Sequence, residues 1–319
     1  MENNRLLLIL NPTAGKKLAQ SRLFEIIDCF VKAGYEVTVH TTQNPGDATT
    51  QLMARGEQYG RVVCCGGDGT LNEAVTGLER LSRRPMLGYI PTGTTNDFAQ
   101  SLGFSRNPLE AAQTAATGVP FPCDIGRFGG RCFTYIAAFG AFTDVPYTTD
   151  QRAKNLFGRM AYLFEGMGKL GKLRSFDMEI ETEHTVFQDS FLFGAVANSL
   201  SIAGYRSPFA SQVAMDDGLF EVLLIRQPQN AAELNKLISD LLTQQLDQQQ
   251  VRFFQTRRLK IHSTQPVSWT LDGEDGGSCT QGEICCLRKA ITFIAPPQPR
   301  KETEEEKQPT QLHKAAATI

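Results

Sequence analysis

The sequence predicts an α/β N-terminal domain, with a doubly wound and mostly parallel sheet, followed by a mainly antiparallel β C-terminal domain. Over the first ~125 residues, short apolar runs alternate with segments of helical spacing, which is typical of parallel sheets with crossover helices. After Cys123 strand-like segments dominate, and the turns between them are rich in Gly and Asp. We therefore expect one domain over residues 1–125, which the C-terminal segment 296–319 is a candidate to join, and a second over 126–295.

The first domain should begin with a strand at "RLLLILNP" (5–12), a continuous apolar run bounded by a turn. A helix follows at 21–34, where apolar residues recur at helical spacing and Gly34 suits the C-cap. The remaining expected elements are a strand at "YEVTVHTT" (35–42), a helix at 46–60, a strand at "RVVCCGG" (61–67), a helix at 70–81, a strand at "PMLGYIPTGT" (85–94) and a short helix at 96–103.

The second domain should open with a hairpin over 123–142 that has "FGGR" at its tip. A helical segment is expected at 153–173, and a second helix at 230–246. The other segments read as strands: "FDMEIET" (176–182), "SFLFGAVANS" (190–199), "GLFEVLLIR" (218–226), "LKIHS" (259–263), "VSWTLDGE" (267–274), "GEICCLRK" (282–289) and "AITFIAP" (290–296).

Composition limits the classes of function. The chain has 319 residues and a formal net charge of -2, so no overall basic field attracts nucleic acid. The N-terminal apolar run stops at Asn11-Pro12, too early for a signal peptide, and no apolar run approaches ~18 residues. We therefore expect a cytoplasmic protein. The eight cysteines lack C-x-x-C spacing, which argues against zinc and favours free thiols.

Three Gly-bearing loops each follow a predicted strand: "NPTAGKK" (11–17), "GGDGTLNE" (66–73) and "PTGTTNDF" (91–98). Ligands of open parallel sheets bind outside the carboxyl ends of the strands, so these loops should converge on one site. Glycine lets the backbone approach a phosphate, and helix N-termini direct N–H groups at anions. Asp68 lies in the middle of the second loop, where its carboxylate should repel a phosphate, so the loops predict a nucleotide site and leave the role of Asp68 open.

These three motifs, together with "MDDGLFEV" (215–222) and "LDGE" (271–274), resemble the diacylglycerol kinase catalytic domain. The likeness is greatest to the soluble, ATP-dependent diacylglycerol kinases of Gram-positive bacteria, and it covers the chain except its tail. The resemblance implies that residues 1–125 bind ATP and that 126–295 take the lipid. The implied ATP-binding residues are Asn11, Pro12, Thr13, Ala14, Gly15, Lys16, Thr42, Gly66, Gly67, Asp68, Gly69, Thr70, Leu71, Asn72, Glu73 and Thr94.

The resemblance also assigns roles to acidic residues. Asp68, Asp97 and Asp124 are similar to acids that act through Mg²⁺ and ordered water in this family. Asp272 and Glu274 resemble its catalytic acids, and phosphoryl transfer to an alcohol needs a group that orients and deprotonates the hydroxyl. Glu274 is our first choice as that base and Asp272 the second. From the residues alone, "DGED" could be a solvated turn, and Asn96 and Asp97 a helix cap.

A second metal site is implied at "AMDDGLFEV". Asp217 resembles a structural Mg²⁺ ligand of the family, with the backbone carbonyls of Ala214 and Leu219 completing the site. From the residues alone, Asp216-Asp217-Gly218 would be interpreted as an ordinary turn before a strand.

The expected reaction is ATP-dependent phosphorylation of diacylglycerol to phosphatidic acid. The segment 152–176 mixes apolar and basic residues, which suits either an anionic membrane surface or a core-packing helix. We expect lipid presented by a membrane surface, peripheral association with the inner face of the membrane, no nucleic acid and, from the family likeness, a homodimer. The alternatives are a kinase for NAD, a sphingoid base, monoacylglycerol or another lipid alcohol, and a non-catalytic nucleotide or lipid sensor.

Overall fold

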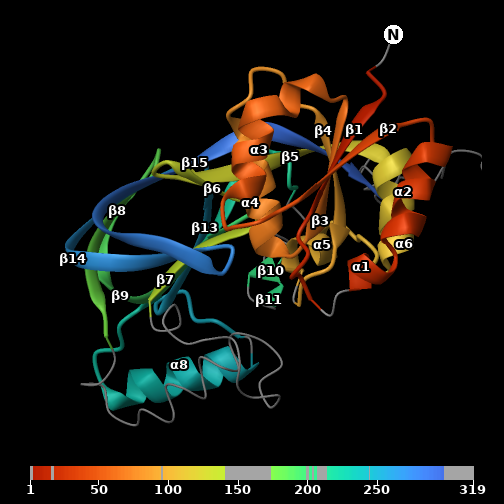
Figure 1. Ribbon diagram of the computed structural model, residues 1–319. Coiled ribbons are helices and arrows are strands. Elements are labelled where there is room, and N and C mark those ends of the chain that lie inside the picture. The colour runs from red at the N-terminus through yellow and green to blue at the C-terminus, as the bar shows by residue number, and fades with distance from the viewer. Residues whose placement is uncertain are drawn as a thin grey trace, which may run out of the picture.

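The computed structural model describes residues 3–15, 18–94, 96–140, 174–198, 201–202, 205–206, 214–243 and 245–297. The helix predicted over 153–173 lies outside these ranges. The chain forms two lobes that share long strands (Figure 1).

The first lobe contains a parallel sheet of four strands. They lie in the order β2-β1-β3-β4 and are all parallel, so each connection between consecutive strands must return to the starting edge of the sheet. Each one is a predicted strand: β1 (Arg5–Leu10), β2 (Glu36–Thr41), β3 (Arg61–Gly66) and β4 (Met86–Pro91). Their carboxyl ends lie at one edge, since Leu10 pairs in register with both Thr41 and Cys65.

Helices cover both faces of this sheet, as a doubly wound fold requires (Figure 1). Alternate residues of β3 show the two faces: Cys65 packs with the helices α2 and α6, and Cys64 with α3 and α4. The helices of this lobe are α1 (Leu18–Ser21), α2 (Leu23–Lys32), α3 (Asp47–Arg55), α4 (Asp68–Glu79), α5 (Asp97–Ser101) and α6 (Pro108–Thr117), with a short 3₁₀ turn η1 (Gly56–Gln58).

Helix α6 is absent from the elements that the sequence predicted. Asn107 caps it by accepting a hydrogen bond from the N–H of Leu109 (3.0 Å), and Pro108 occupies its first position. Its buried residues after Pro108 are all alanines (Ala111, Ala112, Ala115 and Ala116), which give a weak apolar signal in the sequence.

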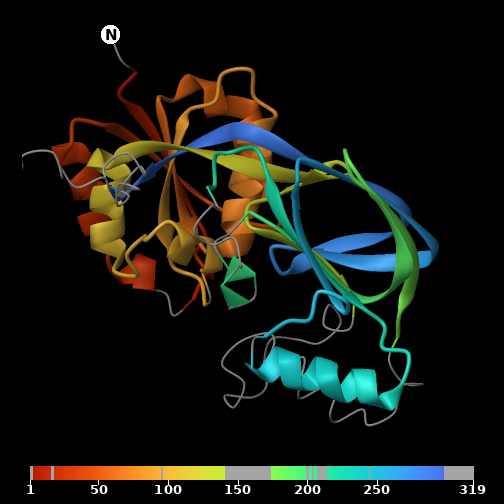
Figure 2. The same cartoon turned by 180° about the vertical axis from the view of Figure 1, so that it is seen from behind.

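The second lobe is built from antiparallel strands (Figure 2). Its strands are β5 (Val119–Phe128), β6 (Arg131–Phe133), β7 (Ile136–Gly140), β8 (Phe176–Glu181), β9 (Val186–Ala197), β12 (Phe220–Arg226), β13 (Val251–Thr256), β14 (Arg258–Leu271) and β15 (Glu274–Ala295). A separate small hairpin joins β10 (Ser201–Ile202) to β11 (Tyr205–Arg206). The predicted fold class, parallel α/β followed by antiparallel β, is therefore confirmed.

Two further predictions for this lobe hold. The chain turns at Gly129-Gly130 between β5 and β6, so the "FGGR" hairpin is present. The predicted helix at 230–246 is α8 (Ala231–Thr243), which packs Leu234, Leu237 and Leu241 against the face of β9 and β12 that points away from the aromatic core.

The strand β15 joins the two lobes. It pairs antiparallel with β14 and β5, and near its end Phe293 and Ile294 pair in parallel with Leu87 and Gly88 of β4. Apart from β10 and β11, the described strands therefore belong to one sheet of 13 strands. The division of the chain at residue 125 stays a prediction, because β5 and β15 each run through both lobes.

Two broad features follow from the helices and cysteines. No helix among the described residues is long and apolar enough to cross a membrane. The eight cysteines are free, as predicted. Burial raises the pKa of the Cys65 thiol to about 12, which fits a small apolar residue of the core better than a reactive thiolate.

Candidate active site

Three loops follow β1, β3 and β4 and meet at the carboxyl edge of the parallel sheet. The amide Nδ2 of Asn11 donates to Oγ1 of Thr70 (2.9 Å), which links the first loop to the start of α4. The N–H of Thr92 donates to the carbonyl of Gly66 (2.9 Å), which links the third loop to the second. The convergence predicted from the three motifs is present.

Glycines let these loops approach one another. A Cβ placed on Gly93 would lie 2.5 Å from the Cα of Gly67, so the two backbones are in direct contact. Gly15 has φ +55, and a Cβ there would lie 2.0 Å from the carbonyl oxygen of Thr92. The result is a cradle with exposed backbone, which suits a phosphate group. Lys16, predicted to reach the phosphates, lies outside the described residues.

Asn96 closes the third loop. It is buried in a left-handed conformation (φ 52), and its Oδ1 accepts from the N–H of Gly93 (2.9 Å). Its Nδ2 donates back to the carbonyl of Gly93 (2.9 Å). Asn96 precedes α5, but its side chain makes no capping bond to that helix. Thr94 is exposed beside this loop, and the side chain of Asp97 lies outside the described residues.

Helix α4 supplies the floor of the cradle. Asp68 is its first residue and is partly exposed, whereas the side chain of Leu71 is fully buried in the core. Any contact of Leu71 with a ligand would therefore use its backbone. Thr42, predicted on the adenosine side, donates its N–H to the carbonyl of Leu10 (2.9 Å), which places it at the same sheet edge.

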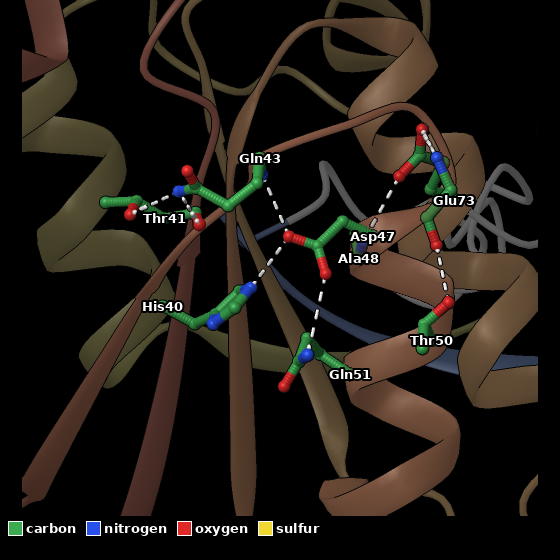
Figure 3. A network of polar contacts seen from close by, with 9 residues as sticks. His40, Thr41, Gln43, Asp47, Ala48, Thr50, Gln51 and Glu73 are labelled. Carbon is green, nitrogen blue, oxygen red and sulfur yellow. Dashed lines mark hydrogen bonds and ion pairs between the residues drawn. The ribbon is translucent and has the colours of Figure 1, made fainter.

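Glu73 holds the start of α3 (Figure 3). Its Oε1 accepts from the N–H of Gly46 (2.7 Å), and its Oε2 accepts from the N–H of Ala48 (3.2 Å). The N-cap residue of α3 is Gly46, which has no side chain, so Glu73 of α4 satisfies these N–H groups in its place. The prediction that Glu73 contacts ATP remains a prediction, while its carboxylate is already engaged in this cap.

A second set of bonds orders the loop after β2 (Figure 3). Nε2 of His40 and Oδ2 of Asp47 are 3.0 Å apart, and the same oxygen accepts from the N–H of Gln43 (2.9 Å). The hydrogen bonds from His40 and Gln43 hold the pKa of Asp47 below its ordinary value. The loop that carries Thr42 is therefore held in place at both ends of the segment 40–47.

Glu274 brings an exposed carboxylate to the cradle. It is the first residue of β15, directly after the turn from β14, and a Cβ placed on Gly69 would be 3.0 Å from its Oε1. Gly69 belongs to the first turn of α4, so the carboxylate stands beside the helix N-terminus where phosphates would bind. A carboxylate in this place can accept a proton from a hydroxyl that attacks a bound phosphate.

Asp272, two residues earlier, has a different environment. It is 4% exposed, and its Oδ1 accepts from the N–H groups of Tyr135 (3.0 Å) and Ile136 (3.1 Å). Its Oδ2 accepts from the N–H (2.7 Å) and Oγ1 (2.9 Å) of Thr134 and from Nδ2 of Asn72 (2.8 Å). Burial raises the pKa of Asp272, while these hydrogen bonds act in the opposite direction.

Asp124 lies with the predicted metal residues. It is fully buried on β5, and its two carboxylate oxygens accept from the N–H groups of Gly218 (2.5 Å) and Lys289 (2.6 Å). Its own N–H donates to the carbonyl of Met215 (2.7 Å). Burial raises the pKa of Asp124 despite the bonds from Lys289 and Gly218. The structure thus brings Asp124 together with the segment 214–219.

The segment 214–219 partly fits a cation. Oδ1 of Asp217 accepts from the N–H of Leu219 (2.9 Å), which makes the turn that the sequence allowed. The family likeness assigned the carboxylate of Asp217 and the backbone carbonyls of Ala214 and Leu219 to a metal ion. No group of three or more His, Cys, Asp and Glu side chains among the described residues could hold a metal ion. A cation here would depend on one carboxylate, backbone oxygens and water.

Sequence reasoning did not single out two residues of this arrangement. Gly93 lies inside the quoted "PTGTTNDF", and a glycine in a strand-end loop is a usable signal of close backbone approach. Thr134 gives no such signal, because its bonds to Asp272 join two residues that are 138 positions apart in the sequence.

Two family models match the chain. The model described as "Diacylglycerol kinase catalytic domain" matches residues 5–128, and the model described as "YegS C-terminal NAD kinase beta sandwich-like domain" matches residues 139–294. A diacylglycerol kinase of Bacillus subtilis is 33% identical over 93% of this chain and 98% of that protein. A diacylglycerol kinase of Staphylococcus carnosus is 34% identical over 85% of this chain and 88% of that protein.

Solved structures have the same fold. The crystal structure of a diacylglycerol kinase from Bacillus anthracis superposes with a TM-score of 0.71 at 23% identity and covers 93% of this chain and 98% of that one. A further Bacillus anthracis structure superposes with a TM-score of 0.76 at 24% identity, over 93% of this chain and 97% of that one.

Proposed function

Because the chain belongs to the diacylglycerol kinase family, we propose that it transfers the γ-phosphoryl group of ATP to the free hydroxyl of diacylglycerol, giving phosphatidic acid and ADP. The observation that carries the proposal is the exposed carboxylate of Glu274 beside the first turn of α4, within a cradle of three Gly-bearing loops. The cradle suits the phosphates of a nucleotide, and the carboxylate suits a hydroxyl acceptor.

The chain's own groups would bind ATP mainly through backbone. Gly67 and Gly69 have no side chain that would keep a phosphate from the backbone at the start of α4, and the N-terminus of this helix favours negative charge. Asp68, at that same N-terminus, is the carboxylate that would face the phosphates through a cation. Mg²⁺, when bound, would neutralise phosphate charge as the phosphoryl group moves. Asp97 and Asp124 stay proposed members of that network, and Ala214, Asp217 and Leu219 stay a proposed structural Mg²⁺ site.

Glu274 is the better candidate base of the two catalytic acids. Its carboxylate is exposed at the cradle, so a substrate hydroxyl can approach it. The carboxylate of Asp272 accepts five hydrogen bonds within the protein, and a carboxylate offers about four lone-pair sites. Glu274 would orient the diacylglycerol hydroxyl and take its proton as the oxygen attacks the γ-phosphorus.

The lipid would be met at a membrane surface. Diacylglycerol resides in the bilayer, so we propose that this chain contacts the cytoplasmic face of the membrane peripherally. The predicted basic and apolar segment at 152–176 lies mostly outside the described residues. A homodimer also remains a proposal.

Transfer of label from [γ-³²P]ATP to lipid in mixed micelles tests the function. Diacylglycerol, monoacylglycerol, sphingosine and undecaprenol serve as acceptors, with and without Mg²⁺. We expect labelled phosphatidic acid with diacylglycerol, and loss of transfer when Mg²⁺ is chelated. Label on another acceptor alone would make this a kinase for that lipid, and ATP binding without transfer to any acceptor would favour a sensor.

The variant Glu274→Gln tests the base. We expect its kcat to fall by about 10²–10⁴-fold, because general base catalysis contributes that much, while the KM for ATP changes little. Glu36→Gln, an exposed glutamate at the start of β2, is the matched control and should keep wild-type turnover. Full turnover by Glu274→Gln would show that another group takes the proton.

A further inference from the structure

Asn72 connects the two lobes beneath the cradle. It lies in the first part of α4, which belongs to the parallel lobe, and its Nδ2 donates to two acceptors of the antiparallel lobe. One is the carbonyl of Cys132 on β6 (2.9 Å), and the other is Oδ2 of Asp272 in the turn after β14 (2.8 Å). The side chain that the family likeness assigned to ATP is thus engaged with the other lobe.

The hydrogen bond from Asn72 to Asp272 also restrains Glu274, because a tight turn connects the two acids. Only Asp272 and Gly273 separate the paired residues Leu271 and Glu274, so the connection is a two-residue hairpin. Both residues have positive φ (52 and 86), as a type I′ turn requires, and Asp-Gly is a favoured sequence for it. A fixed Asp272 therefore leaves the backbone of Glu274 little freedom.

The contacts close a ring. Glu274 lies against Gly69, and Asn72, three residues further along α4, holds Asp272. Residues three apart on a helix lie on one face, so α4 carries both the anion-binding end and the anchor of the base. The position of Glu274 relative to the cradle therefore depends on the hydrogen bond that Asn72 of α4 donates to Asp272.

We propose that Asn72 and Asp272 form a pin that positions Glu274 over the N-terminus of α4, so both are positioning residues for phosphoryl transfer. The proposal rests on the proposed function, in which Glu274 takes the proton of the acceptor hydroxyl. Asp272 accepts hydrogen bonds from Thr134, Tyr135, Ile136 and Asn72, and its carboxylate holds the turn in place.

The first test separates the pin from ATP binding. In Asn72→Ala we expect kcat to fall by about tenfold or more, since a hydrogen bond to a charged group is lost, with the KM for ATP within about twofold of wild type. A large rise in the KM for ATP at unchanged kcat would overturn the proposal, because Asn72 would then contact the nucleotide.

A double-mutant cycle tests whether Asn72 acts through Glu274. If it does, Asn72→Ala should cost little additional kcat once Glu274→Gln is present, so the two effects are not additive. Equal effects of Asn72→Ala in the wild-type and Glu274→Gln backgrounds would overturn the proposal. A general loss of folding would give such equal effects, and far-UV circular dichroism of each variant identifies it.

The pH profile of Asn72→Asp gives a signature that loss of packing would not produce. The new carboxylate would replace an amide nitrogen 2.8 Å from Oδ2 of Asp272, and two such carboxylates cannot both be charged without strong repulsion. At low pH one shared proton restores the hydrogen bond, and at higher pH it is lost. The ratio of variant to wild-type kcat should therefore fall as pH rises from about 6 to about 8.

Asn107→Asp is the control for this arm, because it adds the same charge at the N-cap of α6, where aspartate caps equally well. Its kcat ratio should not change with pH, and a flat ratio for Asn72→Asp as well would overturn the pin. If wild type phosphorylates no lipid, the proposed function fails first. The contact itself is then tested by the unfolding free energy of Asn72→Asp, which should fall with rising pH relative to Asn107→Asp.

Discussion

At the scale of single residues, the burial of Asp124 makes the stability of the fold depend on pH. Its carboxylate holds Gly218 and Lys289 through their N–H groups and is fully buried. Burial raises its pKa above the ordinary aspartate value, so the folded chain keeps the proton to higher pH than the unfolded chain does. The stability that Asp124 contributes is fully present at pH values below the ordinary aspartate pKa. It is lost as pH rises through the raised pKa of the folded chain.

Asp124→Asn removes that titration. We expect the variant to be less stable than wild type by about 1–3 kcal/mol near pH 4, because an amide N–H would face a backbone N–H. The difference should shrink as pH rises to about 7, since only wild type loses stability there. Urea unfolding across this range measures it, with Asp28→Asn, a partly exposed aspartate of α2 that pairs with Lys32, as control. A difference that grows with pH would contradict the assigned direction.

The residues of the site were only partly predictable. "LDGE" places two acids side by side, and the sequence cannot say which one is buried. The choice depends on the positive φ of Asp272 and on donors at 134–136, which come from a distant part of the chain. The Gly-bearing loops were easier, because glycine at a strand end indicates close backbone approach wherever its partner lies.

At the scale of elements, α3 depends on a residue of α4. Glu73→Ala should lower the unfolding free energy by about 1–2 kcal/mol, because the N–H groups of Gly46 and Ala48 lose their acceptors. Glu73→Gln keeps one carbonyl oxygen and should lose less. Urea unfolding measures both variants, and Glu57→Ala, which removes a carboxylate that accepts from Ser82 and Arg83 on the surface, is the comparison.

The effect of Glu73 on ATP binding can be measured separately from its effect on stability. If Glu73 only caps α3, Glu73→Gln should keep the KM for ATP within about twofold of wild type at a temperature where it is folded. A tenfold rise in that KM with unchanged stability would return Glu73 to the nucleotide contacts that the family likeness implied.

Most elements of the first lobe were predictable, and the errors in the second have local causes. The sequence predicts two strands where β14 runs unbroken, because Pro266 has no N–H and the pairing with β15 shifts between His262 and Val267. It also predicts two strands where β15 runs unbroken. The apolar pattern is interrupted there by a bulge between Leu287 and Ile291, in which Lys289 has φ 50. Strand β13, which was not predicted, lies at the edge of the sheet.

At the scale of the whole molecule, the shared strands should make unfolding cooperative. Trp269 is the one tryptophan of the chain and lies between Phe128 and Phe139 in the second lobe. Most of the described helices lie in the first lobe. We expect tryptophan fluorescence and far-UV circular dichroism to give coincident urea transitions, as in two-state unfolding.

Phe293→Ala tests the cause of that cooperativity. Phe293 is fully buried, stacks near Phe98 and pairs β15 with β4, so its truncation should cost about 3–5 kcal/mol. Both probes should shift together. A shift of the circular dichroism transition alone would mean that the lobes unfold independently.

The fold class could be predicted because strand and helix periodicities differ strongly between the two halves. The way the halves join could not, because the pairing of Phe293 with Leu87 depends on residues far apart in sequence and on no local pattern. The same holds for the bond from Asn72 to Asp272, which spans 200 residues.

The parallel pairing of β15 with β4 also means that β4 lacks this partner strand during most of translation. The strand that covers β4 is translated about 200 residues after it, which takes on the order of 10–40 s at ordinary elongation rates. During that interval the nascent first lobe has an open, apolar edge, the kind of surface that chaperones cover and that aggregates form on. Stop codons placed between residues 98 and 291 should therefore yield insoluble chains, even though the three loops of the nucleotide cradle have already been made.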